Sequence, residues 1–139
     1  QCGRRNDALK LWLAWRECGD AGWASLVEGY VALADHLQSR IDDHPNLQMM
    51  SSRSWTNVCF RYVPSKSGMD LNELNSELRL RIMQNADFMV SRSNIGENVV
   101  IRSVISNPGI SEGTLDAFVD EVLRIGQDVE NGLPRESIY

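Results

Sequence analysis

The 139-residue sequence predicts an α+β domain, in which a mostly antiparallel sheet carries helices on one face and follows a long helix. Several stretches repeat apolar residues at helical spacing, whereas others are rich in the β-branched and aromatic residues typical of strands. Most of the expected strands are joined by short connections, which favours antiparallel pairing. The sequence contains no internal repeat and no interdomain linker.

The N-terminal third predicts two helices, over residues 7–18 and 23–41. Gly19 and Gly22 lie between them and predict a break, because glycine frequently ends helices. Pro45 predicts the end of the second helix, since the residue before a proline is pushed away from helical angles. The apolar positions of the two helices are Ala8, Leu11, Trp12, Trp15, Trp23, Leu26, Val27, Tyr30, Val31, Ala34, Leu37 and Ile41.

The middle of the sequence changes to a period of two residues. A short strand is expected over residues 47–50, and a stronger one over residues 55–63. In the second strand, alternation sets Val58, Phe60 and Tyr62 on one face, and Asn57, Cys59 and Arg61 on the other.

The last part predicts a helix, two strands and a final helix. Asp70 with Glu73 resembles a capping box in front of a helical stripe that ends at Ile82. Residues 88–90 and 99–105 are expected to be strands, joined by a polar connection that contains Asn94 and Gly96. A turn at residues 107–109 then leads to Ser111, a suitable N-cap for a helix that buries Leu115, Phe118, Val119 and Val122.

Composition excludes several classes of protein. The net charge of −5 is spread over mixed acids and bases, so nothing predicts the clustered basic surface of a nucleic-acid-binding protein. No apolar run approaches the roughly 20 residues that span a bilayer, so no membrane partner is expected. The three cysteines form no Cys-x-x-Cys pair and no zinc-ligand spacing with the histidines, which predicts reduced thiols, no metal site and a cytoplasmic location.

Arg102 is the most unusual candidate for a binding residue. Alternation sets it on the same strand face as Val100 and Val104, and a charge buried among β-branched neighbours would need a partner. Its planar fork suits bidentate binding of a carboxylate. The alternative is an arginine on a solvated strand face, with its aliphatic stem over its neighbours.

The other candidates each have a simpler structural explanation. Cys2 to Arg5 could contact a phosphate or carboxylate, although a surface turn explains this segment at least as well. Residues 57–62 mix basic and aromatic side chains as RNA-stacking strands do, but core packing explains Phe60 and Tyr62 better. The tryptophans at helical spacing indicate core or interface, and neither His36 nor His44 has a nucleophile beside it in the sequence. We therefore expect no complete catalytic set.

Three blocks resemble the C-terminal part of the group II pyridoxal-phosphate (PLP)-dependent amino-acid decarboxylases, in particular the glutamate and cysteine-sulfinate branch. The first block is Gln1 to Arg5 with residues 7–15, and the second is Thr56 to Phe60 with residues 62–64. The third is Ile101 to Pro108, followed by Ile125 to Asp128. The blocks occur in the family's order and span nearly the whole sequence. The abrupt start, without methionine, agrees with the expectation of a C-terminal part.

This resemblance implies a fold-type I enzyme that is a homodimer and removes the α-carboxylate of a small amino-acid substrate. Residues 1–19 would end the large cofactor domain, and residues 20–139 would form a bridging helix and the small domain. Arg102 falls on the family's arginine that binds the substrate carboxylate. Cys2, Gly3 and Arg4 could make a minor contribution to cofactor binding.

The resemblance also implies a missing lysine. Lys10 and Lys66 are the only lysines, and neither matches the family's His-Lys cofactor motif, which lies upstream of Gln1. The upstream large domain would bind PLP, so the chain alone is expected to be inactive. Glutamate, aspartate or cysteine sulfinate is the favoured substrate, with diaminobutyrate or another amino acid left open because Arg61 stands where the branch usually has an aromatic residue. The alternative function is a free-standing α+β module that uses Arg102 to bind an anion.

Overall fold

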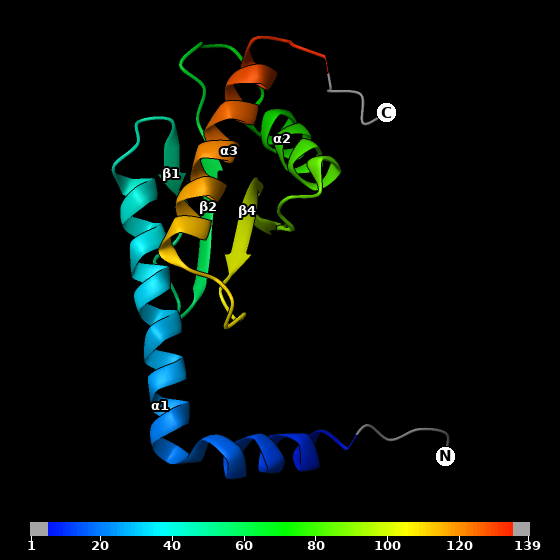
Figure 1. Ribbon diagram of the computed structural model, residues 1–139. Coiled ribbons are helices and arrows are strands. Elements are labelled where there is room, and N and C mark those ends of the chain that lie inside the picture. Colours follow the sequence, from blue (N-terminus) through cyan, green and yellow to red (C-terminus); the bar gives the residue numbers. More distant parts are fainter. Residues whose placement is uncertain (1–5, 135–139) are drawn as a thin grey trace.

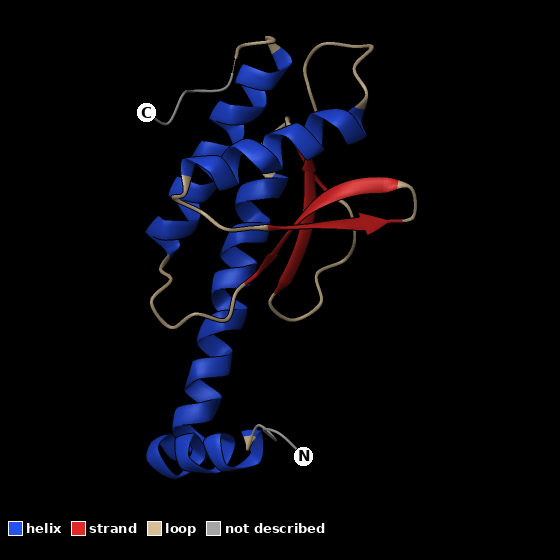
Figure 2. Ribbon diagram, turned by 90° about the vertical axis from the view of Figure 1, so that its right-hand side faces the viewer, coloured by secondary structure: helices blue, strands red, loops and turns tan. Residues whose placement is uncertain are grey.

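The computed structural model, described here for residues 6–134, is a four-stranded antiparallel sheet covered on one face by helices (Figures 1 and 2). The strands are β1 (Leu47–Met49), β2 (Asn57–Tyr62), β3 (Ser91–Ile95) and β4 (Asn98–Val104), in the order β1-β2-β4-β3. The helices are α1 (Asp7–Asp42), α2 (Leu71–Asn85) and α3 (Glu112–Glu130). The predicted α+β class with an antiparallel sheet is confirmed.

Helix α1 consists of two segments that meet at Gly19. This residue has φ 66° and ψ 178°, a conformation that essentially only glycine adopts. The bend directs residues 7–18, the N-terminal arm, sideways from the end of the long segment that follows (Figure 1). The predicted break is therefore confined to Gly19. Gly22 stays helical, and a Cβ atom there would lie 2.9 Å from the Cβ of Cys18, on the arm.

The core lies between the sheet and the helices. Helix α3 packs between α1 and α2, and the rings of Phe60 and Phe118 meet edge to face with centroids 6.1 Å apart. Side chains that alternate along β2 and β4 supply the sheet's contribution, as burial of apolar area requires. The fully buried large side chains are Phe60, Leu37, Ile41, Leu78, Ile82, Ile101, Ile105, Val58, Val100, Val119, Val122 and Asn75.

Asn75 is the polar member of this core, and its hydrogen bonds connect α2 to β2. Its Oδ1 accepts a hydrogen bond from the backbone N–H of Tyr62 at 2.8 Å, and its Nδ2 donates to the Tyr62 carbonyl at 2.9 Å. Nδ2 also donates to the carbonyl of Leu71 at 2.8 Å. The amide thereby satisfies the backbone of Tyr62, which lies beyond Phe60, the last residue of β2 that pairs with β4.

Both predicted N-caps form, but the hydrogen bonds of α2 do not include the reciprocal half of the capping box expected from Glu73. Asp70 accepts hydrogen bonds from the N–H groups of Asn72 and Glu73, and Ser111 forms a reciprocal capping box with Thr114. These caps satisfy N–H groups that have no partner within the helix.

The predicted strand over residues 88–90 is wrong, because β3 begins at Ser91. Phe88 packs instead on Phe118, with ring centroids 5.4 Å apart. The residues of β3 are mostly polar, so the sequence carried no hydrophobic signal for this edge strand. The hairpin from β3 to β4 turns at Gly96, which has φ 59°.

None of the helices within residues 6–134 combines the length and the apolar character that crossing a membrane would require.

Candidate functional site

The face of the sheet opposite the helices, called here the open face, carries the candidate site (Figure 2). Cys59 lies opposite Arg102, which lies opposite Ser91 on the other side. Because side chains alternate, this register fixes which residues share the face. They are Gln48, Asn57, Cys59, Arg61, Ser91, Ser93, Ile95, Asn98, Val100, Arg102 and Val104, and none of them is acidic.

Arg102 is exposed near the end of β4, so of the two alternatives for its environment the structure has the solvated strand face and not the buried charge. Val100 on the same face is 1% exposed, but Val104, beyond Arg102, is 45% exposed. No described helix covers this end of the open face, and the guanidinium remains in solvent, as the solvated-face alternative predicts. Within residues 6–134, no carboxylate forms an ion pair with it.

Cys59 forms the floor beside Arg102. Its side chain is buried, which agrees with the small hydrophobic role predicted for it. Burial raises the pKa of its thiol, and the nearby Arg102 guanidinium and a hydrogen bond with Ser51 oppose that rise. The opposing effect of Arg102 agrees with the register, which puts its charge on the same face as the thiol.

Arg61 is the second arginine of the open face. Its Nε and one Nη atom donate to Gln48 Oε1 at 3.0 and 2.8 Å, and its other Nη atom donates to Asn98 Oδ1 at 3.2 Å. Gln48 is its cross-strand neighbour on β1. Two neutral amides thus hold Arg61 in place without neutralising it.

An apolar rim, formed by Trp55, Met89 and Val104, lies at the Arg102 end of the sheet. The three side chains are 71%, 89% and 45% exposed. Trp55 precedes β2, Met89 precedes β3 and Val104 ends β4, and the pairing brings these three strand ends together. A concentration of large exposed apolar side chains marks a surface that contacts another surface.

Trp55 is held in an uncommon backbone conformation. Its φ is 55°, in the left-handed region that residues other than glycine rarely adopt. The Arg53 guanidinium donates to the Trp55 carbonyl and pairs with Asp35 on α1. These contacts fix the turn that presents the indole ring to solvent.

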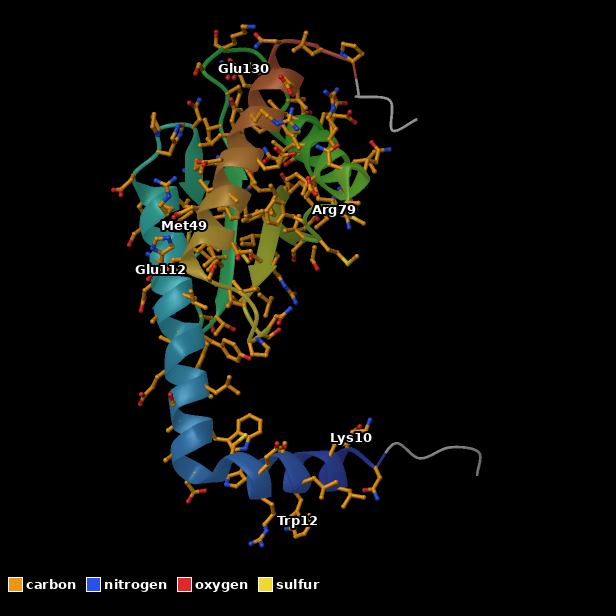
Figure 3. The ribbon with its side chains drawn as sticks, viewed as in Figure 1. Lys10, Trp12, Met49, Arg79, Glu112 and Glu130 are labelled. Carbon is orange, nitrogen blue, oxygen red and sulfur yellow. The ribbon has the colours of Figure 1, made fainter. Side chains whose placement is uncertain are left out.

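A polar cluster at the other end of the molecule was not predicted. The Glu130 carboxylate, at the end of α3 (Figure 3), accepts hydrogen bonds from the Tyr62 hydroxyl at 3.0 Å and from the N–H groups of Ser65 and Lys66 at 3.2 and 2.8 Å. It borders a cavity of about 500 Å³ that His44 and Gln127 also line. Its members lie far apart in the sequence and match no motif.

The titration of this cluster follows from its hydrogen bonds. Burial acts to raise the pKa of Glu130, but the hydrogen bonds from Lys66, Tyr62 and Ser65 outweigh it and lower the pKa. Burial and the same carboxylate raise the pKa of Tyr62 to about 12. The cluster therefore joins the loop after β2 to α3, with the Glu130 carboxylate ionised and the Tyr62 phenol protonated.

The histidines serve the scaffold. His36 Nε2 lies 2.9 Å from Asp116 Oδ1, which joins α1 to α3, and His44 Nδ1 accepts a hydrogen bond from the N–H of Asn46 at 3.2 Å. Within the described part of the chain, no group of three or more metal-ligating side chains is arranged around a common point.

Neither lysine belongs to the open face. Lys10 lies on the N-terminal arm, 3.7 Å from Asp7 (Figure 3), and Lys66 donates to Asn131 Oδ1 at 2.6 Å, beside Glu130. Residues 1–5, and with them the candidates Cys2, Gly3 and Arg4, lie outside the described residues.

Comparison with known proteins shows which proteins this chain resembles. The model of the pyridoxal-dependent decarboxylase conserved domain matches residues 1–63. Mouse CSAD (cysteine sulfinic acid decarboxylase), in its apo form, has 29% sequence identity and a TM-score of 0.82, over 92% of this chain and 29% of its own. The chain matches the C-terminal part of the pyridoxal-dependent decarboxylases. The predicted family resemblance is confirmed.

More distant decarboxylase structures share the fold. Oryza sativa TDC, solved with PLP and tryptamine, has 22% identity and a TM-score of 0.83, over 94% of this chain and 29% of its own. The glutamate decarboxylase domain of the Vibrio parahaemolyticus diaminobutyrate-pyruvate transaminase and L-2,4-diaminobutyrate decarboxylase has 18% identity and a TM-score of 0.78, over 90% and 27%. This chain thus spans less than a third of the decarboxylases that it matches.

Proposed function

We propose that this chain is the C-terminal part of a PLP-dependent amino-acid decarboxylase and that Arg102 binds a carboxylate of the substrate. One observation carries the proposal: Arg102 is exposed on the open face with no acidic partner among the described residues, in a chain that matches decarboxylases. A solvated arginine fork keeps its N–H donors available for bidentate contact with a carboxylate. Residues 1–19 would complete the cofactor domain, and residues 20–139 would form the bridging helix and small domain.

The residues around Arg102 prepare it for this role. Cys59 gives the guanidinium a buried, uncharged floor, and the strand backbone limits where the side chain can move. The apolar rim would dock on the large domain and exclude water from the substrate. Lower solvent access strengthens the attraction between the guanidinium and a carboxylate.

In this proposal, PLP binding belongs to the large domain and not to the described residues. Lys10 and Lys66 lie away from Arg102, and Lys66 is engaged by Asn131. When bound elsewhere in the protein, the cofactor supplies the electron sink that decarboxylation requires. The contribution of this chain is to bind and orient the substrate, and we expect no turnover from residues 1–139 alone.

An acidic amino acid, such as glutamate, aspartate or cysteine sulfinate, is the proposed substrate. The open face carries two arginines and no acidic residue. Among the matched proteins, mouse CSAD, whose name specifies cysteine sulfinic acid, has the higher identity of those compared above. Both observations favour an anionic substrate.

A homodimer and a cytoplasmic location complete the proposal. The N-terminal arm exposes Leu9, Leu11, Trp12, Leu13 and Trp15 at 45–57%, which favours burial against the rest of the protein or a second subunit. This exposed surface also argues against the alternative of a free-standing module. Cys18 and Cys59 are free thiols, as is usual for cytoplasmic proteins.

The test is an activity measurement on the full-length protein loaded with PLP. Release of CO₂ from a panel of acidic and neutral amino acids should identify a substrate, and Arg102→Gln should lower kcat/KM for it. Arg92→Gln is the matched control, because Arg92 lies on the neighbouring strand and faces α2. Absence of CO₂ release from every amino acid would refute the proposal.

A further inference from the structure

Two arginines from neighbouring strands share the open face. Cys59 lies opposite Arg102, so Arg61, two residues further along β2, is the diagonal neighbour of Arg102. Such neighbours are roughly 7–8 Å apart, within reach of long side chains. The other diagonal holds Cys59 and Val100, which are 6% and 1% exposed. The hydrogen bonds of Arg61 draw its guanidinium toward Gln48 and Asn98, so the buried, uncharged side chains of Cys59 and Val100 lie between it and Arg102.

The bonding of Arg61 leaves it able to bind an anion. A guanidinium has five N–H donors, and the three hydrogen bonds to Gln48 and Asn98 leave two of them for another partner. Both acceptors are neutral, so the positive charge of Arg61 is oriented but not compensated. If Arg61 served only to join neighbouring strands, a carboxylate could balance its charge. Within residues 6–134, no carboxylate forms an ion pair with Arg61.

The charge of this surface contrasts with that of the chain. The net charge is −5, yet the open face carries two positive side chains and no negative one. Local concentration of one sign of charge attracts ligands of the opposite sign. One held arginine, Arg61, and one solvent-exposed arginine, Arg102, separated by uncharged side chains, match a short molecule with an acidic group at each end.

We propose that Arg61 and Arg102 together form a site for a ligand with two acidic groups, a dicarboxylate or its sulfinate counterpart, and that Arg61 determines the preference for an acidic side chain. This inference rests on the proposed function, in which Arg102 binds one carboxylate of the substrate. The second acidic group contacts the free N–H donors of Arg61. Arg61 is therefore a specificity-determining residue, held in place by Gln48 and Asn98.

The test measures binding to the full-length protein by isothermal titration calorimetry. Glutarate provides two carboxylates and butyrate provides one. Arg61→Gln removes the second charge, whereas Gln48→Glu keeps the guanidinium and compensates its charge from the same position. Arg92→Gln again serves as the control for charge on a neighbouring strand.

We expect the wild type to bind glutarate more tightly than butyrate. Arg61→Gln should weaken glutarate binding roughly 10- to 100-fold, the usual range for a lost charge-assisted hydrogen bond. Gln48→Glu should also weaken glutarate binding. It tests the two-arginine site by itself if Arg61→Gln does not fold. Butyrate binding, and all binding by Arg92→Gln, should stay within about twofold of the wild type, a difference of about 0.4 kcal/mol.

The results separate this inference from the proposed function. Equal glutarate affinity in the wild type and both variants, or no preference of the wild type for glutarate, overturns the two-arginine site, even in an active decarboxylase. Arg61-dependent glutarate binding by a protein that decarboxylates no amino acid supports the site and refutes the proposed function.

Discussion

The two faces of the sheet differ in what covers them. On the helix-covered face, side chains such as Phe60 and Ile101 are completely buried. On the open face, Cys59 and Val100 are buried, but the two arginines and the apolar rim lie around them. The same strands therefore contribute a fully buried core on one face and a partly exposed surface on the other.

Because of this difference, substitutions on the two faces should affect different properties, namely stability on one face and ligand binding on the other. Changes on the covered face remove packing and should lower the free energy of unfolding. Changes at the exposed positions of the open face remove little packing, so they should alter ligand binding more than stability. Four predictions test this division, from the largest expected effect to the smallest.

Phe60→Ala should cost about 3–5 kcal/mol of unfolding free energy, because it opens a cavity in the closed core. Urea unfolding of residues 1–139, followed by circular dichroism, measures the change. Val104→Ala on the open face is the matched control and should cost less than about 1 kcal/mol, since Val104 is 45% exposed. Equal losses in the two variants would contradict the division of the faces.

Gly126→Ala should cost roughly 1–3 kcal/mol through overpacking. A Cβ atom at this position of α3 would lie 2.4 Å from ring atoms of Tyr62 on β2. Gly113→Ala on the same helix is the control, because the nearest atom to a Cβ there is Ser111 Oγ, at 3.9 Å. The control should be neutral or slightly stabilising. Thermal unfolding of both variants checks the difference, and a stable Gly126→Ala protein would show that the contact of α3 with β2 is looser.

Arg102→Gln should separate function from stability. In the full-length protein we expect kcat/KM to fall roughly 10- to 100-fold, the range for a lost charge-assisted contact with substrate. The unfolding free energy of residues 1–139 should change by less than about 0.5 kcal/mol, because the side chain is exposed. A large loss of stability would instead make Arg102 a structural residue of the sheet.

Glu130→Gln should remove a pH-dependent part of the stability. The pKa of Glu130 is lowered in the folded chain, so its contribution is present above the unfolded pKa and is lost as the pH falls through the folded pKa. Urea unfolding at neutral and acidic pH should show a smaller loss on acidification in the variant than in the wild type. Tyr62→Phe, which removes one of the three hydrogen bonds, should give an intermediate profile. Parallel profiles for all three proteins would contradict this role.

The helices and the covered face could be predicted because apolar periodicity reports directly on burial. Leu37, Leu78 and Val122 all occupy predicted apolar stripes and are completely buried. Strand β3 could not be predicted in the same way, because its mostly polar residues pair through the backbone at an edge of the sheet. Phe88 is a residue type typical of strands, but it lies before β3 and packs on Phe118 in the core.

The part of the site that could be predicted is the part where one residue differs clearly from its sequence neighbours. Arg102 stood out from the apolar strand around it, although its exposure depends on what covers the sheet, which alternation does not reveal. The partners of Arg61 depend on strand register, and Gln48 and Asn98 are too distant in the sequence to be associated with it. Glu130 likewise meets Tyr62 only after α3 has packed on β2.

The bend at Gly19 sets the reach of the molecule. A straight α1 of 36 residues would be a rod of about 54 Å, with Trp12 near its far tip. The bend shortens that reach, because the aromatic arm leaves the end of the long segment sideways (Figure 1). No atom lies within 4 Å of where a Cβ of residue 19 would be, so the backbone angle alone requires glycine. A side chain there would redirect the arm and separate the stacked rings of Trp15 and Trp23, which lie on either side of the bend. Any assembly that depends on the arm would lose its alignment while the sheet remained intact.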